Sequence, residues 1–396
     1  MEHTLTSQVP PSARSPRRPA RAESVGSLLR PPAIKTVFER VFANHESHAI
    51  QLLDDAERAE LEALDSIADD LIRTAVARQI SVGLDVVTDG EMRRAHFVNS
   101  LFDAVVGIAD NSAKDYFAGD DRVGPPPDPV AIDRLRLVDN PLAREIRFLQ
   151  SCTAHPAKVT IPAISNFYML QYNTEAYGSR DEFVQHMGDL SRELIMGAID
   201  AGARYIQFDF PLYPALADPE KRAELEHGLG WDAEAILSSA IAVDNAALDG
   251  LPSDVTTAVH MCRGNYRSHW WARGSLEPVA ERMFNELRFD RFLVEWEDTA
   301  REGDYAPLRF VPRPGPIVVM GVVSSKLSVL EADDEILRRM ADAASFLDYD
   351  QLALSPQCGF ASVWHGNELT EDEQWRKLDL VGRVADRIWG SSKADS

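Results

Sequence analysis

Cysteine, basic residues and long apolar runs are all scarce in this chain of 396 residues, and each shortage narrows the class of protein. Only three cysteines occur, too few for a disulfide framework, so a reducing cytoplasm is expected. The 63 acidic residues outnumber the 41 basic ones, and the formal charge of −22 argues against a general nucleic-acid binder. No run is apolar enough to cross a bilayer, and the first residues lack the apolar core of a signal peptide. A soluble globular protein without a membrane partner is therefore predicted.

Most of the chain alternates between apolar, β-branched runs and helical patterns. Eight runs are interpreted as buried strands, at 22–29, 84–91, 158–163, 204–209, 256–259, 292–296, 316–323 and 352–354. Helical patterns follow nearly all of them, at 54–76, 181–201, 232–248, 276–287, 333–346 and 371–388. Continuous apolar strands alternating with helices predict a single (β/α)₈ TIM barrel over residues 21–396. A doubly wound open sheet is the alternative, but no glycine-rich nucleotide-binding fingerprint follows the first strand.

Two stretches depart from this alternation. Residues 1–20 are rich in proline, serine and arginine and have no apolar periodicity, so they are expected to form a disordered tail. Residues 92–155 follow the second predicted strand and show few clear strands of their own. We interpret them as an insertion over the barrel mouth, which is either a functional lid or plain surface decoration.

A histidine and two cysteines end two of the predicted strands. Side chains of alternate strand residues point to the same side, so His260 and Cys262 can face one point, and Cys358 follows another strand. Two thiols and an imidazole are three of the four ligands that a tetrahedral zinc ion requires, and Glu295 on the intervening strand is a candidate for the fourth. The alternative is that both cysteines are ordinary buried thiols.

Further polar residues occupy equivalent positions on other strands. Ser27, Glu91, Asp209 and Ser325 lie at or just after the carboxyl ends of predicted strands. In a (β/α)₈ barrel this end carries the active site. A single polar residue there could be a cap or a loop anchor, but so many of them together predict a catalytic face.

Three runs of residues resemble the cobalamin-independent methionine synthase family, and in particular the single-barrel branch of its catalytic C-terminal domain. They are HMCRGN at 260–265, GDYAPLRF at 303–310 and LSPQCGFAS at 354–362, and the resemblance extends over about 21–389. It implies a zinc-dependent methyltransferase of methionine biosynthesis that moves a methyl group from methyltetrahydrofolate to the zinc-bound thiol of homocysteine. The zinc ligands that it implies are His260, Cys262, Glu295 and Cys358.

The resemblance also implies a binding site for the amino-acid part of homocysteine. Its positions map onto Val25, Gly26, Ser27, Glu91 and Asp209. This assignment agrees with the chemistry, because an ammonium group needs carboxylates and a carboxylate needs backbone N–H donors. The alternative is that the two acidic residues pair with nearby arginines, namely Arg93, Arg94 or Arg204.

The methyl-donor side departs from the family pattern. Ser24 stands where relatives tend to have histidine, Phe210 follows Asp209 where an acidic residue is usual, and Phe167 stands where a tryptophan would face the pterin. The proton-donating histidine of the family is absent from 323–326, which leaves Lys326 and Ser325 as the local candidates for the acid.

The predicted function is therefore a zinc-dependent thiol alkyltransferase whose partners are a small-molecule thiol and an alkyl donor. Methyltetrahydrofolate is one candidate donor. The alternatives are another electrophile or thiol, as in epoxide–thiol transferases or a biosynthetic C–S or lyase step, and a catalytically inactive zinc-binding barrel. The oligomeric state stays open, with a homodimer as one option.

Overall fold

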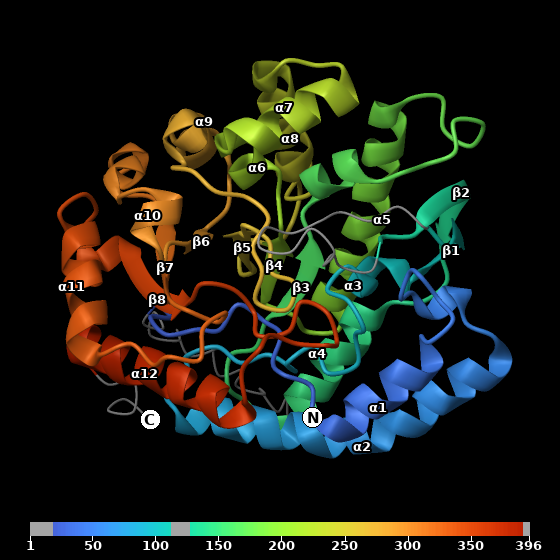
Figure 1. The fold of residues 1–396 in the computed structure, drawn as a ribbon, viewed down its shortest axis with the longest axis horizontal. Coiled ribbons are helices and arrows are strands. Elements are labelled where there is room, and N and C mark those ends of the chain that lie inside the picture. The colour runs from blue at the N-terminus through green and yellow to red at the C-terminus, as the bar shows by residue number, and fades with distance from the viewer. Residues whose placement is uncertain (1–18, 112–126, 391–396) are drawn as a thin grey trace, which may run out of the picture.

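A parallel sheet forms the centre of the computed structural model, which describes residues 19–111 and 127–390. Six strands follow one another in chain order, and helices surround them (Figure 1). The strands are β3 (Val159–Pro162), β4 (Tyr205–Asp209), β5 (Thr256–Met261), β6 (Arg291–Glu295), β7 (Ile317–Val323) and β8 (Leu352–Pro356). Nearly all of their residues are buried, as expected for strands covered on both faces.

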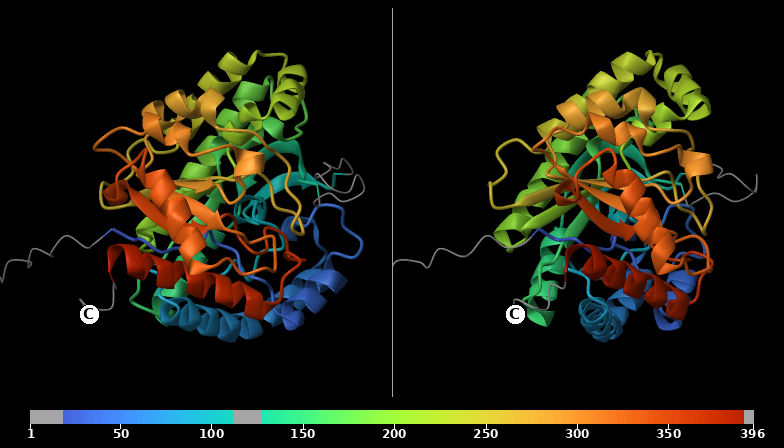
Figure 2. Two further views of the ribbon diagram at one scale, coloured as in Figure 1. Left: turned by 60° about the vertical axis from the view of Figure 1, so that its left-hand side comes forward. Right: turned by 90° about the vertical axis from the view of Figure 1, so that its left-hand side faces the viewer.

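The longer helices are α1 (Pro32–Val41), α2 (Asp55–Ser81), α4 (Pro141–Cys152), α5 (Arg180–Asp200), α7 (Pro219–Leu229), α8 (Ala233–Ala246), α9 (Glu277–Glu286), α11 (Asp333–Ala344) and α12 (Glu371–Trp389). Shorter ones are α3 (Asn99–Phe102), α6 (Tyr213–Ala217) and α10 (Thr299–Glu302). All six predicted helices are confirmed within a few residues, whereas α1, α4 and α7 were not predicted. In Figures 1 and 2, α2 and α12 lie side by side, and a Cβ on Gly382 of α12 would come within 2.0 Å of the carbonyl oxygen of Val82, just after α2.

Two of the eight predicted strands, at 22–29 and 84–91, are not regular strands. They form isolated parallel bridges: Ala22 with Leu354 of β8, Glu23 with Val86, and Val87 with Ala157 before β3. The two segments therefore lie between β8 and β3. Gln79 of α2 explains part of the irregularity, because its side-chain amide bonds to both the N–H and the carbonyl of Thr88, at 3.0 and 2.9 Å.

The insertion at 92–155 contains more structure than its sequence indicated. After α3 comes an antiparallel pair, β1 (Val105–Ala109) with β2 (Val130–Leu137), and α4 follows. This pair was not predicted individually, because the charged residues of β2 break its apolar alternation. Residues 112–126 of the insertion and 1–18 of the predicted tail lie outside the described residues.

Within the described ranges, every helix is too short or too polar to cross a membrane.

A buried ion cluster closes the end of the sheet where the strands begin. The Glu23 carboxylate accepts hydrogen bonds from Lys158 Nζ at 2.7 Å, the Tyr205 hydroxyl at 2.8 Å and Arg291 Nη2 at 2.7 Å. Burial alone would raise the pKa of Glu23, but the two cations lower it to about 2. The four side chains are almost completely buried, so this end is sealed and the opposite end remains for a site.

Candidate metal centre

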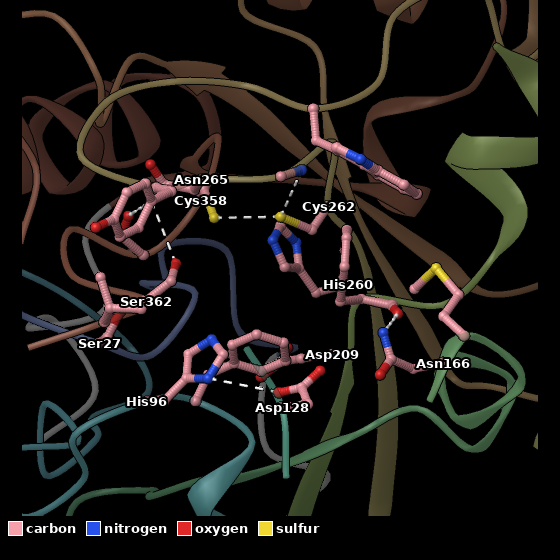
Figure 3. A pocket seen from close by; sticks show the side chains of 18 of the residues that line it. Ser27, His96, Asp128, Asn166, Asp209, His260, Cys262, Asn265, Cys358 and Ser362 are labelled. Atoms are coloured by element: carbon pink, nitrogen blue, oxygen red, sulfur yellow. Dashed lines mark hydrogen bonds and ion pairs between the residues drawn. The ribbon is translucent and has the colours of Figure 1, made fainter. Parts of the chain in front are cut away.

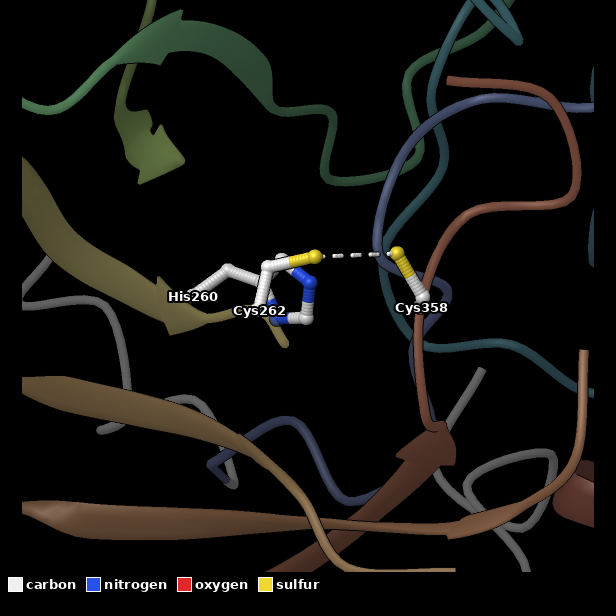
Figure 4. A group of neighbouring side chains, drawn as sticks. All are labelled: His260, Cys262 and Cys358. Atoms are coloured by element: carbon white, nitrogen blue, oxygen red, sulfur yellow. Dashed lines mark hydrogen bonds between the residues drawn. The ribbon is translucent and has the colours of Figure 1, made fainter. Parts of the chain in front are cut away.

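His260, Cys262 and Cys358 meet at the carboxyl end of the sheet. His260 lies in β5, Cys262 follows it directly, and Cys358 comes two residues after β8. Their ligand atoms all lie within 4.8 Å of one another, and all three residues are buried (Figure 4). The two sulfur atoms are 3.5 Å apart, well beyond the disulfide distance of about 2.05 Å. The sequence prediction that these three side chains converge is therefore confirmed.

The cluster has the properties of a metal site. Both ring nitrogens of His260 are buried without a hydrogen-bond partner in the described part of the chain. Buried polar atoms almost always have a hydrogen-bond or metal partner. The two unpaired nitrogens therefore indicate a ligand that binds from the pocket. A hydrogen bond between the thiols raises the pKa of Cys262 and lowers that of Cys358, so one thiolate is already favoured. One imidazole and two sulfur ligands fit zinc.

Glu295, the predicted fourth ligand, lies beside the cluster but outside the group of three. Its Oε1 accepts hydrogen bonds from Lys326 Nζ at 2.6 Å, Gln357 Nε2 at 2.8 Å and Arg301 Nη2 at 3.2 Å. Its Oε2 accepts only the backbone N–H of Arg263, at 3.0 Å. Burial would raise the pKa of Glu295, but the two cations outweigh it and lower the value. Coordination by this carboxylate stays a prediction, with Oε2 as the more accessible atom.

A cavity of about 190 Å³ opens above the cluster. Among the residues that line it are those predicted for metal and thiol binding, namely Val25, Ser27, Glu91, Asp209, His260, Cys262 and Cys358. Figure 3 shows His260, Cys262, Cys358 and Asp209 from different elements pointing into this one space. The structure thus brings together the polar ends of several strands at one pocket.

Two acidic side chains in the pocket wall lack strong cationic partners. Asp209, the last residue of β4, accepts a hydrogen bond from Gln207 at 2.7 Å, and burial raises its pKa to about 7. Glu91 accepts one from the Thr160 hydroxyl at 3.0 Å through Oε1, and its buried Oε2 has no partner among the described residues. Burial also raises the pKa of Glu91, so a bound cation would stabilise both carboxylates.

The three candidate arginine partners are mostly engaged elsewhere. Arg93 pairs with Asp65 and Asp69, and Arg204 pairs with Asp254. Arg94 lies 4.0 Å from Glu91, but its guanidinium donates two hydrogen bonds to Glu145. Within the described ranges Asp209 therefore has no ion pair, and Glu91 has only one long contact.

Gly26 supports the position of Glu91 without lining the pocket. A Cβ at this position would lie 2.8 Å from Glu91 Oε1 and 3.2 Å from the methyl carbon of Thr160. Contacts this short force a neighbour to move, and the end of the Glu91 side chain is the easiest group to displace.

Gly26→Ala is therefore expected to weaken thiol binding by about 10-fold while the zinc content stays the same, because one charged hydrogen-bond acceptor is lost. Calorimetric titration with homocysteine and metal analysis measure the two quantities. Gly228→Ala is the matched control, since a Cβ there meets nothing within 4 Å. Equal thiol affinities in the two variants would show that Glu91 does not take part in thiol binding.

Three predicted residues do not reach the pocket. Phe167 lies in a 3₁₀ turn (Ile164–Met169) and is fully buried in the core, whereas its neighbour Asn166 lines the cavity. Ser325 and Lys326 lie behind Cys358 in the loop after β7 and are not among the residues that line the cavity. The roles assigned to these three residues stay predictions.

Sequence reasoning missed several residues of the pocket wall. His96 and Phe97 come from the insertion, and Tyr266 and Trp271 from the loop after β5. The only signal in the sequence is the density of aromatic residues near His260, in a loop without strand or helix periodicity.

The fold and the site define a parallel α/β protein with a histidine–cysteine–cysteine centre at the carboxyl end of its sheet. Residues 45–371 match the family described as "Cobalamin-independent synthase, Catalytic domain", so the chain belongs to this family. This result confirms the resemblance found in the sequence.

Individual relatives cover nearly the whole chain. The uncharacterized protein YxjH of Bacillus subtilis is 33% identical over 94% of this chain and 96% of its own length. A putative vitamin-B12 independent methionine synthase from Listeria monocytogenes matches with a TM-score of 0.69 at 28% identity, covering 94% and 98%. A B12-independent methionine synthase from Shewanella sp. W3-18-1, solved with selenomethionine, has the same fold, with a TM-score of 0.68 at 20% identity, covering 93% and 97%.

Proposed function

We propose that this protein is a zinc-dependent methyltransferase that alkylates homocysteine or a similar amino-acid thiol. The observation that carries the proposal is the buried group of His260, Cys262 and Cys358 beneath a pocket whose wall holds Asp209 and Glu91. The selenomethionine in the Shewanella relative supports it, because methyl transfer to homocysteine gives methionine. We further propose that the bridged segments at 22–23 and 86–87 close the sheet into an eight-membered barrel.

The role of the metal would be to turn the substrate thiol into a nucleophile. A free thiol has a pKa near 8.5, so only a few per cent is thiolate at neutral pH. His260, Cys262 and Cys358 would hold a zinc ion, whose Lewis acidity would favour the thiolate form of the substrate. The two cysteine thiolates would offset the metal charge and so keep the substrate sulfur nucleophilic. The unsatisfied Oε2 of Glu91 and the carboxylate of Asp209 would accept hydrogen bonds from the substrate ammonium. Both carboxylates face the same cavity as the sulfur atoms.

Residues 323–326 contain no histidine that could serve as the acid of folate chemistry, and Asp209, whose pKa burial raises to about 7, is assigned here to the substrate ammonium. Loss of the amine from methyltetrahydrofolate requires a proton donor at that nitrogen. Burial would lower the pKa of Lys326, but Glu295 outweighs it and raises the value, so this lysine keeps its proton. Its Nζ donates to Glu295 at 2.6 Å. This arrangement supports the second candidate function, thiol alkylation by an electrophile other than methyltetrahydrofolate.

Asp209→Asn is expected to raise the Kd for homocysteine by about 10- to 100-fold, because a buried charge-assisted hydrogen bond is lost. Zinc content should stay at one per chain. Isothermal titration and metal analysis separate the two effects. Asp189→Asn, on the exposed face of α5, is the control. An unchanged Kd in the Asp209 variant would contradict its assignment to the ammonium.

The reaction itself is tested with the zinc-loaded full chain, homocysteine and several alkyl donors in parallel. Mass spectrometry of the product should show an S-alkylated amino acid whose formation requires the metal. Metal-free protein that is fully active, or zinc-loaded protein that alkylates no thiol with any donor, would overturn the proposed function.

A further inference from the structure

One wall of the pocket is a continuous aromatic surface made of Phe97, Phe210 and Trp271. The rings of Phe97 and Phe210 are 6.1 Å apart and nearly perpendicular, and those of Phe210 and Trp271 are 5.7 Å apart at 65°. Phe210 is therefore the middle ring of the three. The three residues come from separate segments, after Glu91, after β4 and after β5 respectively, so the pocket rather than one local motif brings them together.

The backbone of Phe210 adopts an unfavourable conformation that holds it at this place. Its φ is +58°, in the left-handed region that costs a phenylalanine about 1–2 kcal/mol. Hydrogen bonds compensate: its N–H donates to the carbonyl of His260 at 3.2 Å, and Asn166 Nδ2 donates to its carbonyl at 3.1 Å. Strain of this kind persists only where the surroundings enforce it, and it is concentrated at functional sites. The ring is thus fixed beside a predicted metal ligand.

The pocket lacks basic side chains. Among the described residues that line it there is no lysine or arginine, whereas Glu91, Asp128 and Asp209 contribute carboxyl groups. His96 does not supply a charge, because burial lowers its pKa to about 3. A lysine, Lys221, lies 5.1 Å from the ring centre of Trp271 but is paired with Glu224. Glu91 and Asp209 are assigned to the substrate ammonium, so the rest of the wall offers aromatic rings, the Asp128 carboxyl group and no lysine or arginine, a lining that favours a positively charged donor over an anionic one.

We propose that the alkyl donor is a small methyl onium ion, a sulfonium in the first place, bound against Phe210. An aromatic face attracts an alkylated cation, and the attraction strengthens where water is excluded and carboxylates are near. The cavity of about 190 Å³ fits a small donor beside an amino-acid thiol. The inference rests on the proposed function, because it names the second substrate of the same site.

Methyl transfer from an onium donor needs no acid, because its leaving group departs without a proton. The thiolate sulfur of the first substrate attacks the methyl carbon and uses its electron pair to form the new C–S bond. The old bond between this carbon and the onium sulfur breaks, and its pair stays on the leaving sulfide. The sulfide departs neutral, so no proton is transferred and nothing is oxidised or reduced. Phe210 would stabilise the positive charge before transfer and release the neutral product afterwards.

The test uses the zinc-loaded full chain with homocysteine and deuterated trimethylsulfonium, next to methyltetrahydrofolate as the alternative donor. Trimethylsulfonium should yield deuterated methionine and dimethyl sulfide in equal amounts, with background product from the folate. Titration with homocysteine alone is measured in parallel. Normal thiol binding without product from trimethylsulfonium would overturn this inference and leave the proposed function standing, whereas absent thiol binding would overturn the proposed function itself.

The role of the aromatic face is tested by substitution and competition. Phe210→Leu keeps apolar volume but removes the ring, so it should raise the KM for trimethylsulfonium about 10-fold or more with little change in the homocysteine Kd. Phe210→Tyr keeps the ring, so its KM for trimethylsulfonium should be close to that of the native protein. In the native protein, tetramethylammonium should inhibit competitively and its neutral isostere, tert-butyl alcohol, at least about 10-fold more weakly. Equal inhibition by the charged and neutral compounds would overturn the inference even if the leucine variant fails to fold.

Discussion

Replacing Cys262 or Cys358 with serine is expected to abolish zinc binding and to reduce alkyl transfer by at least about 100-fold. The magnitude follows from metal chemistry, because loss of a residue that only orients a ligand already costs about 10- to 100-fold. Serine is nearly isosteric with cysteine, but its hydroxyl is not deprotonated at neutral pH and is a poor ligand for zinc. Metal analysis of the purified variants and a donor-saturated activity assay measure the two losses.

Cys152→Ser is the matched control for these variants. Cys152 is the last residue of α4, is partly exposed and lies outside the pocket. It should keep full zinc content and activity, and circular dichroism should show intact folding in all three variants. Either pocket variant retaining both zinc and activity would contradict the assignment of that cysteine as a ligand.

Glu23→Gln is expected to lower the free energy of unfolding by about 3–5 kcal/mol, the usual cost of breaking a buried ion pair by removing one partner. The variant would leave Lys158 and Arg291 buried without their shared counter-charge, at the end of the sheet away from the pocket. Chemical denaturation at neutral pH measures the loss. Asp254→Asn, which breaks the exposed pair with Arg204, should change the stability little.

The same carboxylate predicts an acid-dependent loss of stability. In the folded protein the pKa of Glu23 is lowered from its ordinary value of 4.5 to about 2, so its contribution to stability is fully present above pH 4.5. That contribution is lost as the pH falls from 4.5 towards 2. Native protein should therefore lose more stability than Glu23→Gln over this interval. Parallel losses in the two proteins would show that Glu23 is not the group responsible.

The sequence predicts the strands and helices well where burial alone determines them. β3 to β8 are continuous apolar runs because both faces of the sheet are buried, one under helices and the other in a cluster of strand side chains that includes Ala258, Leu293 and Val319. This pattern can be read without the fold. The segments at 22–29 and 84–91 look similar, but a side chain from α2, Gln79, takes two of the backbone bonds of Thr88. This contact depends on how the end of α2 packs against the following segment, and it leaves no period in the sequence.

The candidate site could likewise be predicted only in part. The convergence of His260 and Cys262 follows from the two-residue period of a strand, so it could be predicted. The charge environment of Glu295 could not, because Lys326 and Gln357 reach it from other loops. The burial of Phe167 could not be predicted either, since a 3₁₀ turn directs its neighbour Asn166 into the pocket.

X-ray absorption at the zinc edge, recorded with and without homocysteine, tests the central claim most directly. The claim is that the metal of His260, Cys262 and Cys358 binds the substrate sulfur. The spectrum without substrate should show two sulfur ligands at about 2.3 Å and one imidazole nitrogen at about 2.0 Å. Homocysteine should add a third sulfur at the same distance in native protein. A sulfur count that stays at two under saturating homocysteine would contradict the account.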